Sequence, residues 1–340
     1  MNWWTYLLRR TGLAAVQVVA IEILTFVILR VIPANPAYRI AGFDISPEHI
    51  AQIKAELGLD KSIWAQLWDY AVDVAHGRLG TSLSTGDPVW HDLQQRVPAT
   101  LELVVIGLGL AILIGVPLGV WSARRRGGAV GRTVRTYSLL AGSQPDYWWG
   151  LVLVFVFFVV LKIAPGPVGQ LGIGAVPPNH VTGSYLLDSL LTGNWTSLGS
   201  VLSQLVLPIA TVVIVYMAPI LKMTTSSYQD AMRADSIRLL RASGVGESRI
   251  ALITLRLAAQ PIVTTIGICS VFLLGGAALI ETVFGWNGAA QYAVNATVTS
   301  DYAAMQGVVL VIAALAALAY LLTDVVQMLL DPRVRSGHAE

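Results

Sequence analysis

Long apolar runs separated by polar connections dominate the chain. A helix needs about 20 mainly apolar residues to cross a bilayer. Six runs meet this requirement, covering residues 11–32, 98–121, 139–163, 201–222, 257–282 and 304–330. The pattern therefore predicts an all-α polytopic membrane protein with six transmembrane helices. Because successive spans cross in opposite directions, an even number places both termini on the same side of the membrane.

The connection after the first run, residues 33–97, predicts a small helical insert outside the membrane. Residues 46–58 begin with Ser-Pro-Glu, which is typical of a helix N-terminus, and end with glycine. Residues 63–74 repeat apolar side chains at helical spacing. A segment of this size is too small for an independent enzyme. We therefore expect it to cap the membrane domain or to form part of a docking surface.

The second run contains Gly115 and Gly119, which form a GxxxG spacing. Small residues at this spacing allow two membrane helices to approach closely. Pro117 lies between them and permits a kink, because neighbouring helices can satisfy the carbonyl that it frees. Helix packing is therefore the expected role of this cluster.

A short basic segment lies in the connection 223–256, between the fourth and fifth runs. Asp235 is expected to be its N-cap, and Gly244 to adopt the left-handed conformation that ends a helix. About two turns are too short to span a bilayer or to be stable alone, so we expect the segment to dock against another, soluble protein. The residues expected to form it are Asp235, Ile237, Arg238, Leu240, Arg241, Ala242 and Gly244.

Three acidic side chains in or beside the apolar runs are candidates for a substrate pathway. Glu22 lies near the middle of the first run, where a carboxylate either faces a pathway or forms a neutral, hydrogen-bonded contact between helices. Asp146 follows a proline that interrupts the third run, and either lines a cavity or is a solvated or capping acid. Glu281 lies near the end of the fifth run, where it caps a Gly-rich turn or faces the pathway. Trp286 is expected to be an interfacial anchor.

The charge distribution predicts an orientation. The chain is 55% hydrophobic and 12% charged, whereas a soluble domain is about 25% charged. Fifteen of the 22 Lys and Arg lie at the termini or in the second and fourth connections. The positive-inside rule therefore predicts that both termini and the connections 122–138 and 223–256 are cytoplasmic. We therefore expect a multi-pass protein of the cell inner membrane. Cys269 is the single cysteine of the sequence, so no intrachain disulfide can form.

Several chemistries have no motif in the sequence. The chain contains no GxxxxGK[ST] phosphate loop, no GxSxG elbow and no HExxH helix, and its five His have no zinc-ligand spacing. A transporter of this kind needs an ion gradient or an energised partner. The segment 235–244 favours the partner, because gradient-driven carriers usually contain internal repeats and several buried ionisable groups. We expect no catalytic residue, no metal, no cofactor in this chain and no nucleic-acid partner.

Several motifs, in order along nearly the whole chain, resemble a known family. They are Tyr6-Leu-Leu-Arg-Arg10, Leu29-Arg-Val-Ile-Pro33 with Asn35-Pro36, Leu57-Gly-Leu-Asp-Lys61, Gly80-Thr-Ser82, Arg96-Val-Pro-Ala-Thr-Leu-Glu102, Ile280-Glu-Thr-Val-Phe284 with Trp286 and Gly288, Asp301-Tyr302, Gln306-Gly307 and Asp331-Pro-Arg333. Their order and spacing are similar to those of the B-type permease subunit of dipeptide and oligopeptide ABC importers. Glu22 departs from the family, which usually has a small or hydroxyl residue there.

The resemblance implies a function and a set of partners. Two ABC ATPase subunits or domains would bind ATP and Mg and push a coupling helix in the segment 235–244. In many importers that loop reads Glu-Ala-Ala, then three residues, then Gly. The same frame here is Arg238-Leu239-Leu240, then Arg241-Ala-Ser, then Gly244, so the contact would be basic. A second, homologous permease would complete the pathway, and an extracytoplasmic binding protein would deliver di- or oligopeptides.

The resemblance also divides the chain into an N-terminal segment with the first span (1–32), the insert (33–97), a permease core (98–335) and a tail (336–340). A gradient-driven carrier or channel, a non-transporting scaffold, and an importer of another solute such as a nickel complex or glutathione stay open.

Overall fold

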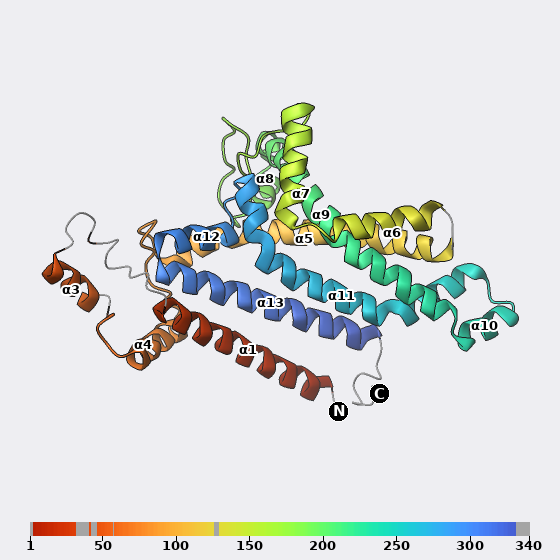
Figure 1. The fold of residues 1–340 in the computed structure, drawn as a ribbon, viewed down its shortest axis with the longest axis horizontal. Coiled ribbons are helices and arrows are strands. Elements are labelled where there is room, and N and C mark those ends of the chain that lie inside the picture. Colours follow the sequence, from red (N-terminus) through yellow and green to blue (C-terminus); the bar gives the residue numbers. More distant parts are fainter. Residues whose placement is uncertain (1–2, 32–40, 42–45, 57, 126–128, 331–340) are drawn as a thin grey trace.

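The computed structural model describes residues 3–31, 41, 46–56, 58–125 and 129–330, and these are mainly helical with no β-strand (Figure 1). The all-α prediction is confirmed. The helices are α1 (Trp3–Val31), α3 (Pro47–Glu56), α4 (Ile63–Ala75), α5 (Val89–Arg124), α6 (Ala129–Ala141), α7 (Asp146–Leu153), the π-helix η1 (Val154–Val160), α8 (Tyr185–Leu191), α9 (Trp195–Met232), α10 (Asp235–Ala242), α11 (Glu247–Phe284), α12 (Ala289–Thr299) and α13 (Tyr302–Leu330).

Five helices in the described chain are long and apolar enough to cross a membrane: α1, α5, α9, α11 and α13. The predicted third span, residues 139–163, is not one straight helix. The chain bends by 104° between α6 and α7, and the bent pair counts as a sixth span only if both parts are taken together. The break falls at Ser143-Gln144-Pro145, where proline disfavours the helical conformation of the residue before it.

Helices α5 and α9 approach each other closely because glycines of α5 face α9. A methyl group at Gly107 would lie 2.5 Å from Val212 Cγ1, and one at Gly119 would lie 2.6 Å from Thr224 Cβ. Gly115 faces Met217 and Ile220, which also lie on α9. The predicted packing role of the GxxxG spacing is confirmed, because any larger side chain at these positions would separate the two helices.

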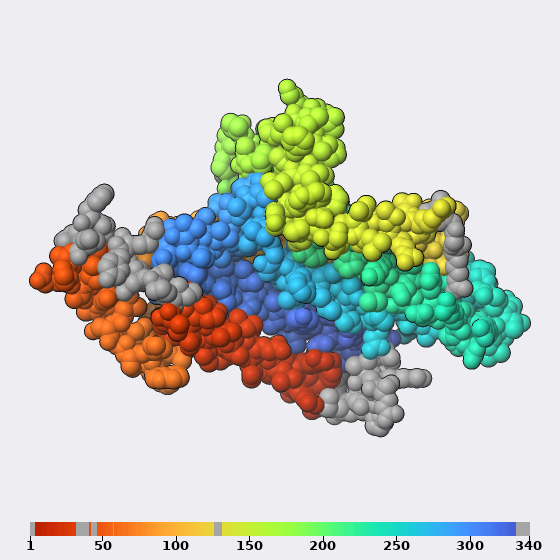
Figure 2. Space-filling model, in the orientation of Figure 1, coloured from red at the N-terminus to blue at the C-terminus, as the bar shows by residue number. Residues whose placement is uncertain are grey.

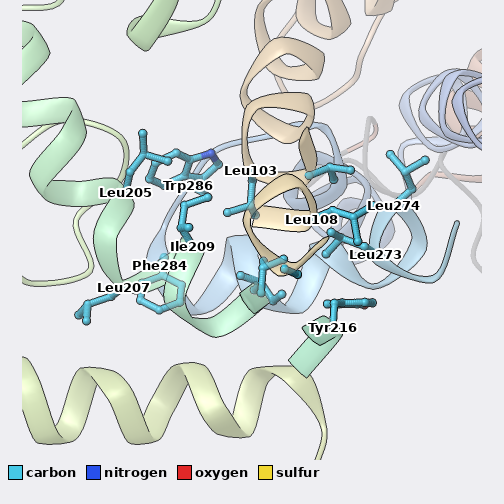
Figure 3. Close-up of a cluster of buried hydrophobic side chains, with 14 of the residues drawn as sticks. Leu103, Leu108, Leu205, Leu207, Ile209, Tyr216, Leu273, Leu274, Phe284 and Trp286 are labelled. Carbon is cyan, nitrogen blue, oxygen red and sulfur yellow. The ribbon is translucent and has the colours of Figure 1, made fainter. Parts of the chain in front are cut away.

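The main hydrophobic core lies where α5, α9 and α11 meet (Figure 3). Leu103 of α5, Val212 of α9 and Leu273 of α11 are completely buried there. Trp286 belongs to the same core, is only 1% exposed, and its indole N–H donates to the Ala99 carbonyl over 3.1 Å. The prediction that Trp286 is an interfacial anchor is therefore wrong. The indole is buried because the chain after α11 folds back onto α5.

The bundle has two distinct ends (Figure 1). Arg10 Nε lies 3.3 Å from Asp324 Oδ2, so the first residues of α1 and the last turns of α13 lie together. This end also carries α10, and we refer to it as the α10 end. The opposite end carries α3, α4 and α12, and we refer to it as the insert end.

The insert contains both predicted helices. In α3, Ile50 and Ile53 are buried, and the chain after it turns at Gly58 with φ of +64°. Helix α4 begins at the N-cap Ser62, whose side chain accepts a hydrogen bond from the Ala65 N–H. Asn35-Pro36, the Asp331-Pro332-Arg333 stop and the tail 336–340 lie outside the described residues.

Candidate functional site

The predicted coupling segment is present as the eight-residue helix α10, held between two of the longest helices. Helix α9 continues ten residues beyond the predicted span end at position 222, about 15 Å at 1.5 Å per residue. Helix α11 begins at Glu247, also ten residues before the predicted start of its span. Helix α10 therefore lies well beyond the apolar stretches of α9 and α11, and it projects from the bundle at this end (Figure 2).

The two ends of α10 differ in how well the sequence predicted them. Ala234 is the N-cap and makes no side-chain cap, whereas Asp235 is the first residue of the helix. The prediction that Asp235 is the N-cap is therefore wrong by one position. Asp235 still favours the helix, because a carboxylate in the first turn opposes the positive end of the helix dipole. Gly244 has φ of +76° in the turn that follows, which confirms the predicted left-handed glycine.

Helix α10 has a buried face and an exposed face. Ile237 is completely buried, whereas Leu240 is only partly buried. Leu239 is 69% exposed, and Arg238 and Ala242 are exposed beside it. The sequence does not single out Leu239, because a leucine next to Leu240 on a short helix looks like part of the buried face. Its exposure in the structure makes it available to a partner.

Two ion pairs between exposed side chains lie in the segment. Arg238 Nη1 lies 3.3 Å from Asp235 Oδ1 within the helix. Arg241 donates from Nε and Nη2 to the two carboxylate oxygens of Glu247, over 2.8 and 3.4 Å. The second pair connects α10 directly to the first residue of α11. Arg241 is therefore placed to fix the orientation of the segment, in addition to any contact with a partner.

Glu22 lies between α1 and the insert. Its Oε1 accepts a hydrogen bond from the Tyr70 hydroxyl of α4 over 2.5 Å, and the side chain is 7% exposed. Oε2 is buried without a hydrogen-bond partner among the described residues. Close by, Arg30 stacks over the Phe26 ring at 3.4 Å and donates to Gln66 of α4. This geometry corresponds to the hydrogen-bonded alternative for Glu22, a carboxyl at an interface between helices.

Asp146 and Glu281 occupy separate positions, and only Glu281 is completely buried. Asp146 Oδ2 accepts a hydrogen bond from Tyr216 of α9 over 2.8 Å, while α7 has no side-chain cap. Glu281 is completely buried and accepts from the Thr100 hydroxyl over 2.5 Å and from the Gln291 N–H over 2.7 Å. The capping alternative is therefore observed for Glu281, at the first turn of α12, but not for Asp146.

The sequence analysis did not predict α12 itself. Its position depends on contacts from distant helices, because Thr100 Oγ1 of α5 accepts a hydrogen bond from the Ala289 N–H over 2.9 Å. A side chain at Gly288 would collide with both Thr100 and Glu281. Trp286 and Gly288 belong to one of the family motifs, but nothing local in that motif indicates a helix start. In the part of the chain that the structure describes, no three metal-ligating side chains are grouped as a metal would require.

A polytopic helical bundle with a short amphipathic helix held outside its apolar region defines a membrane component that engages another protein. The chain belongs to the family of binding-protein-dependent transport system inner membrane components, whose model matches residues 115–336. The model for the N-terminal part of this membrane component matches residues 3–104. Together the two matches cover most of the chain, which confirms the resemblance drawn from the motifs.

Three relatives are similar over nearly their whole length. The probable D,D-dipeptide transport system permease protein DdpB of Escherichia coli K12 is 37% identical, with all of both chains covered. The dipeptide transport system permease protein DppB of the same strain is 36% identical over 97% of this chain and 98% of the relative. The di/tripeptide transport system permease protein DppB of Pseudomonas aeruginosa UCBPP-PA14 is 34% identical, with the same coverage.

Proposed function

We propose that this chain is the permease subunit of an ATP-driven importer for di- or oligopeptides in the inner membrane. A second, homologous permease completes the translocation pathway with it. Two ABC ATPase subunits or domains bind ATP and Mg and supply the energy, and an extracytoplasmic binding protein delivers the substrate. This chain contributes no catalytic residue. Peptides are the proposed substrate because relatives of nearly full-length similarity are named for dipeptide or tripeptide transport.

The observation that carries the proposal is α10. A short helix with one buried anchor, Ile237, and an exposed strip of Arg238, Leu239 and Ala242 fits a groove on a soluble partner. In the proposed orientation the α10 end faces the cytoplasm, because most of the Lys and Arg lie in the connections at that end. The ATPase then lies where ATP is available.

The connections of α10 suggest how motion would be transmitted. When the ATPase subunits close on ATP, they displace α10 as a unit with the ends of α9 and α11. The Arg241–Glu247 pair and the buried Ile237 keep α10 in a fixed orientation to those helices. Because α9 and α11 share a core with α5, a displacement at α10 changes the packing of the bundle rather than only a loop. Alternating access follows if the two permeases separate at one face as they close at the other.

The experiment is reconstitution of the full chain with its co-purified partners in proteoliposomes. The proposal expects co-elution of a P-loop ATPase, and dipeptide uptake that requires both ATP and the binding protein. Uptake driven by an ion gradient without nucleotide would instead identify a gradient-driven carrier. ATP-dependent uptake of a nickel complex or glutathione, with none of dipeptides, would overturn the substrate while keeping the importer. Absence of any flux with all partners present would indicate a scaffold.

A further inference from the structure

A basic cavity lies between α5, α6 and α9 at the α10 end. Its volume is about 560 Å³. Its lining includes Arg125, Arg132, Arg135, Lys222, Ser138 and Thr225. Four of these are cationic, and no Asp or Glu is among the described residues that line the cavity. Such a concentration of like charge is unfavourable unless an anion occupies the cavity.

The four cations are available to a ligand. Among the described residues, none of Arg125, Arg132, Arg135 and Lys222 has a carboxylate within ion-pair distance. Arg125 directly follows α5, Arg132 and Arg135 lie on α6, and Lys222 lies on α9, so an anion between them would be contacted from several sides. Arginine binds phosphate oxygens through paired N–H groups, and lysine adds a point charge. This donor set suits a phosphate group better than a carboxylate.

Hydroxyl groups complete the lining. The Ser138 hydroxyl oxygen is buried and has no hydrogen-bond partner among the described atoms. Thr225 Oγ1, by contrast, already donates to the Leu221 carbonyl over 2.8 Å. The Ser138 hydroxyl therefore keeps an unsatisfied donor among the described atoms.

The wall formed by α6 is held in place. The Tyr137 hydroxyl donates to the Ile214 carbonyl of α9 over 2.5 Å, one residue before Ser138. This contact fixes α6 against α9, and it positions Arg135 and Ser138 on the same short helix. The cavity is therefore a site between packed helices rather than a gap between mobile side chains.

The surroundings favour a lipid over a soluble phosphate. Leu139 and Leu140 are 62% and 59% exposed beside the cavity. Arg125 stacks over the Trp121 ring at 5.1 Å, and this tryptophan is 43% exposed. Tryptophan and arginine together are typical of the headgroup level of a membrane, and the leucines offer a surface for acyl chains. We propose that this cavity binds the phosphate of an anionic phospholipid headgroup, with its acyl chains along α6.

The test measures binding of short-chain phosphatidylglycerol to the full chain in neutral detergent, by native mass spectrometry. The test variant is Arg132→Gln with Arg135→Gln. Its matched control is Arg249→Gln with Arg256→Gln, which removes the same charge from exposed positions on α11 at the same end. Each basic side chain near an anionic lipid contributes about fivefold to affinity, so we expect about 25-fold weaker binding in the test variant. The control is expected to change binding less than about threefold.

Three further results decide between explanations. Lys222→Gln, on a different helix, is expected to weaken binding about fivefold, which excludes a folding defect confined to α6. Equal weakening by the test and control pairs would overturn the site, because it would indicate only general attraction to basic surface. In a competition measurement, inorganic phosphate could displace the bound lipid as effectively as an excess of phosphatidylglycerol does. That result would overturn the lipid assignment and identify a soluble phosphate site.

Discussion

The packing of Ile237 gives the sharpest prediction about coupling. Ile237 is completely buried on a helix of eight residues, whose other side chains are mostly exposed. Replacing a buried isoleucine by alanine costs about 2–5 kcal/mol, and the lower part of that range applies where the surroundings can relax. A helix this short has little stability of its own. The loss in Ile237→Ala should therefore appear as undocking of α10, rather than as unfolding of the bundle.

The size of the effect follows from this number. A loss of about 2–3 kcal/mol changes the ratio of undocked to docked α10 by roughly 30- to 150-fold. Hydrogen exchange of residues 235–244 should accelerate by about this factor, because local opening limits exchange. The amides of α9 and α11 within the core should keep their protection. In proteoliposomes with the partner ATPases, ATP hydrolysis should continue while uptake falls, because α10 no longer transmits the motion.

Leu239→Ala is the matched control for this experiment. Leu239 is on the same helix but is 69% exposed, so its truncation should leave hydrogen exchange of α10 unchanged. Uptake should still fall if Leu239 enters the partner's groove. The reasoning is refuted if Ile237→Ala leaves the exchange of α10 at the wild-type rate, since burial would then contribute nothing to docking. It is also refuted if exchange accelerates equally throughout α9 and α11, since α10 would not be a separate unit.

The remaining predictions concern stability. Tyr70→Phe should destabilise the protein by about 1–3 kcal/mol, because it leaves the Glu22 carboxyl without a hydrogen-bond donor. The same change in a Glu22→Leu background should cost much less. A thermal shift of equal size in both backgrounds would contradict this prediction. Gly107→Ala should destabilise the protein by about 1–3 kcal/mol, because the added methyl group collides with α9. Gly109→Ala is the control, since its methyl group meets no atom within 4 Å, and it should be neutral or stabilising. Equal melting temperatures for the two variants would contradict this prediction. Asp188 is buried, and although burial opposes its ionisation, hydrogen bonds from Thr182 and Gly183 hold its pKa below the ordinary value of 3.8. Because the folded state favours the charged carboxylate, the stabilisation by Asp188 is present above pH 3.8 and is lost as the pH falls below this value. Asp188→Asn should therefore reduce the loss of stability at acid pH. An unchanged pH dependence of stability in the acid range would contradict this.

Local rules account for the features that the sequence predicted well. Helix α3 begins after Ser46, whose Oγ accepts a hydrogen bond from the His49 N–H, the chain turns with positive φ at Gly58 and Gly244, and Gly115 faces a neighbouring helix. A cap, a left-handed glycine and a small residue between membrane helices each depend on a few neighbouring positions. The motif order also led to the family that the whole-chain comparisons confirm.

The sequence by itself determined the helical class, most of the long apolar helices, the short helix α10 and the membership in a transport family. The length of each apolar run and the placement of charges can be read directly from the sequence, because each spanning segment must by itself be long and apolar enough to cross the bilayer. The tertiary structure decided which side chains meet. It buried Trp286 against α5, brought Glu22 into contact with Tyr70 and left Leu239 exposed. These outcomes depend on contacts between residues far apart in the chain, which no local pattern encodes.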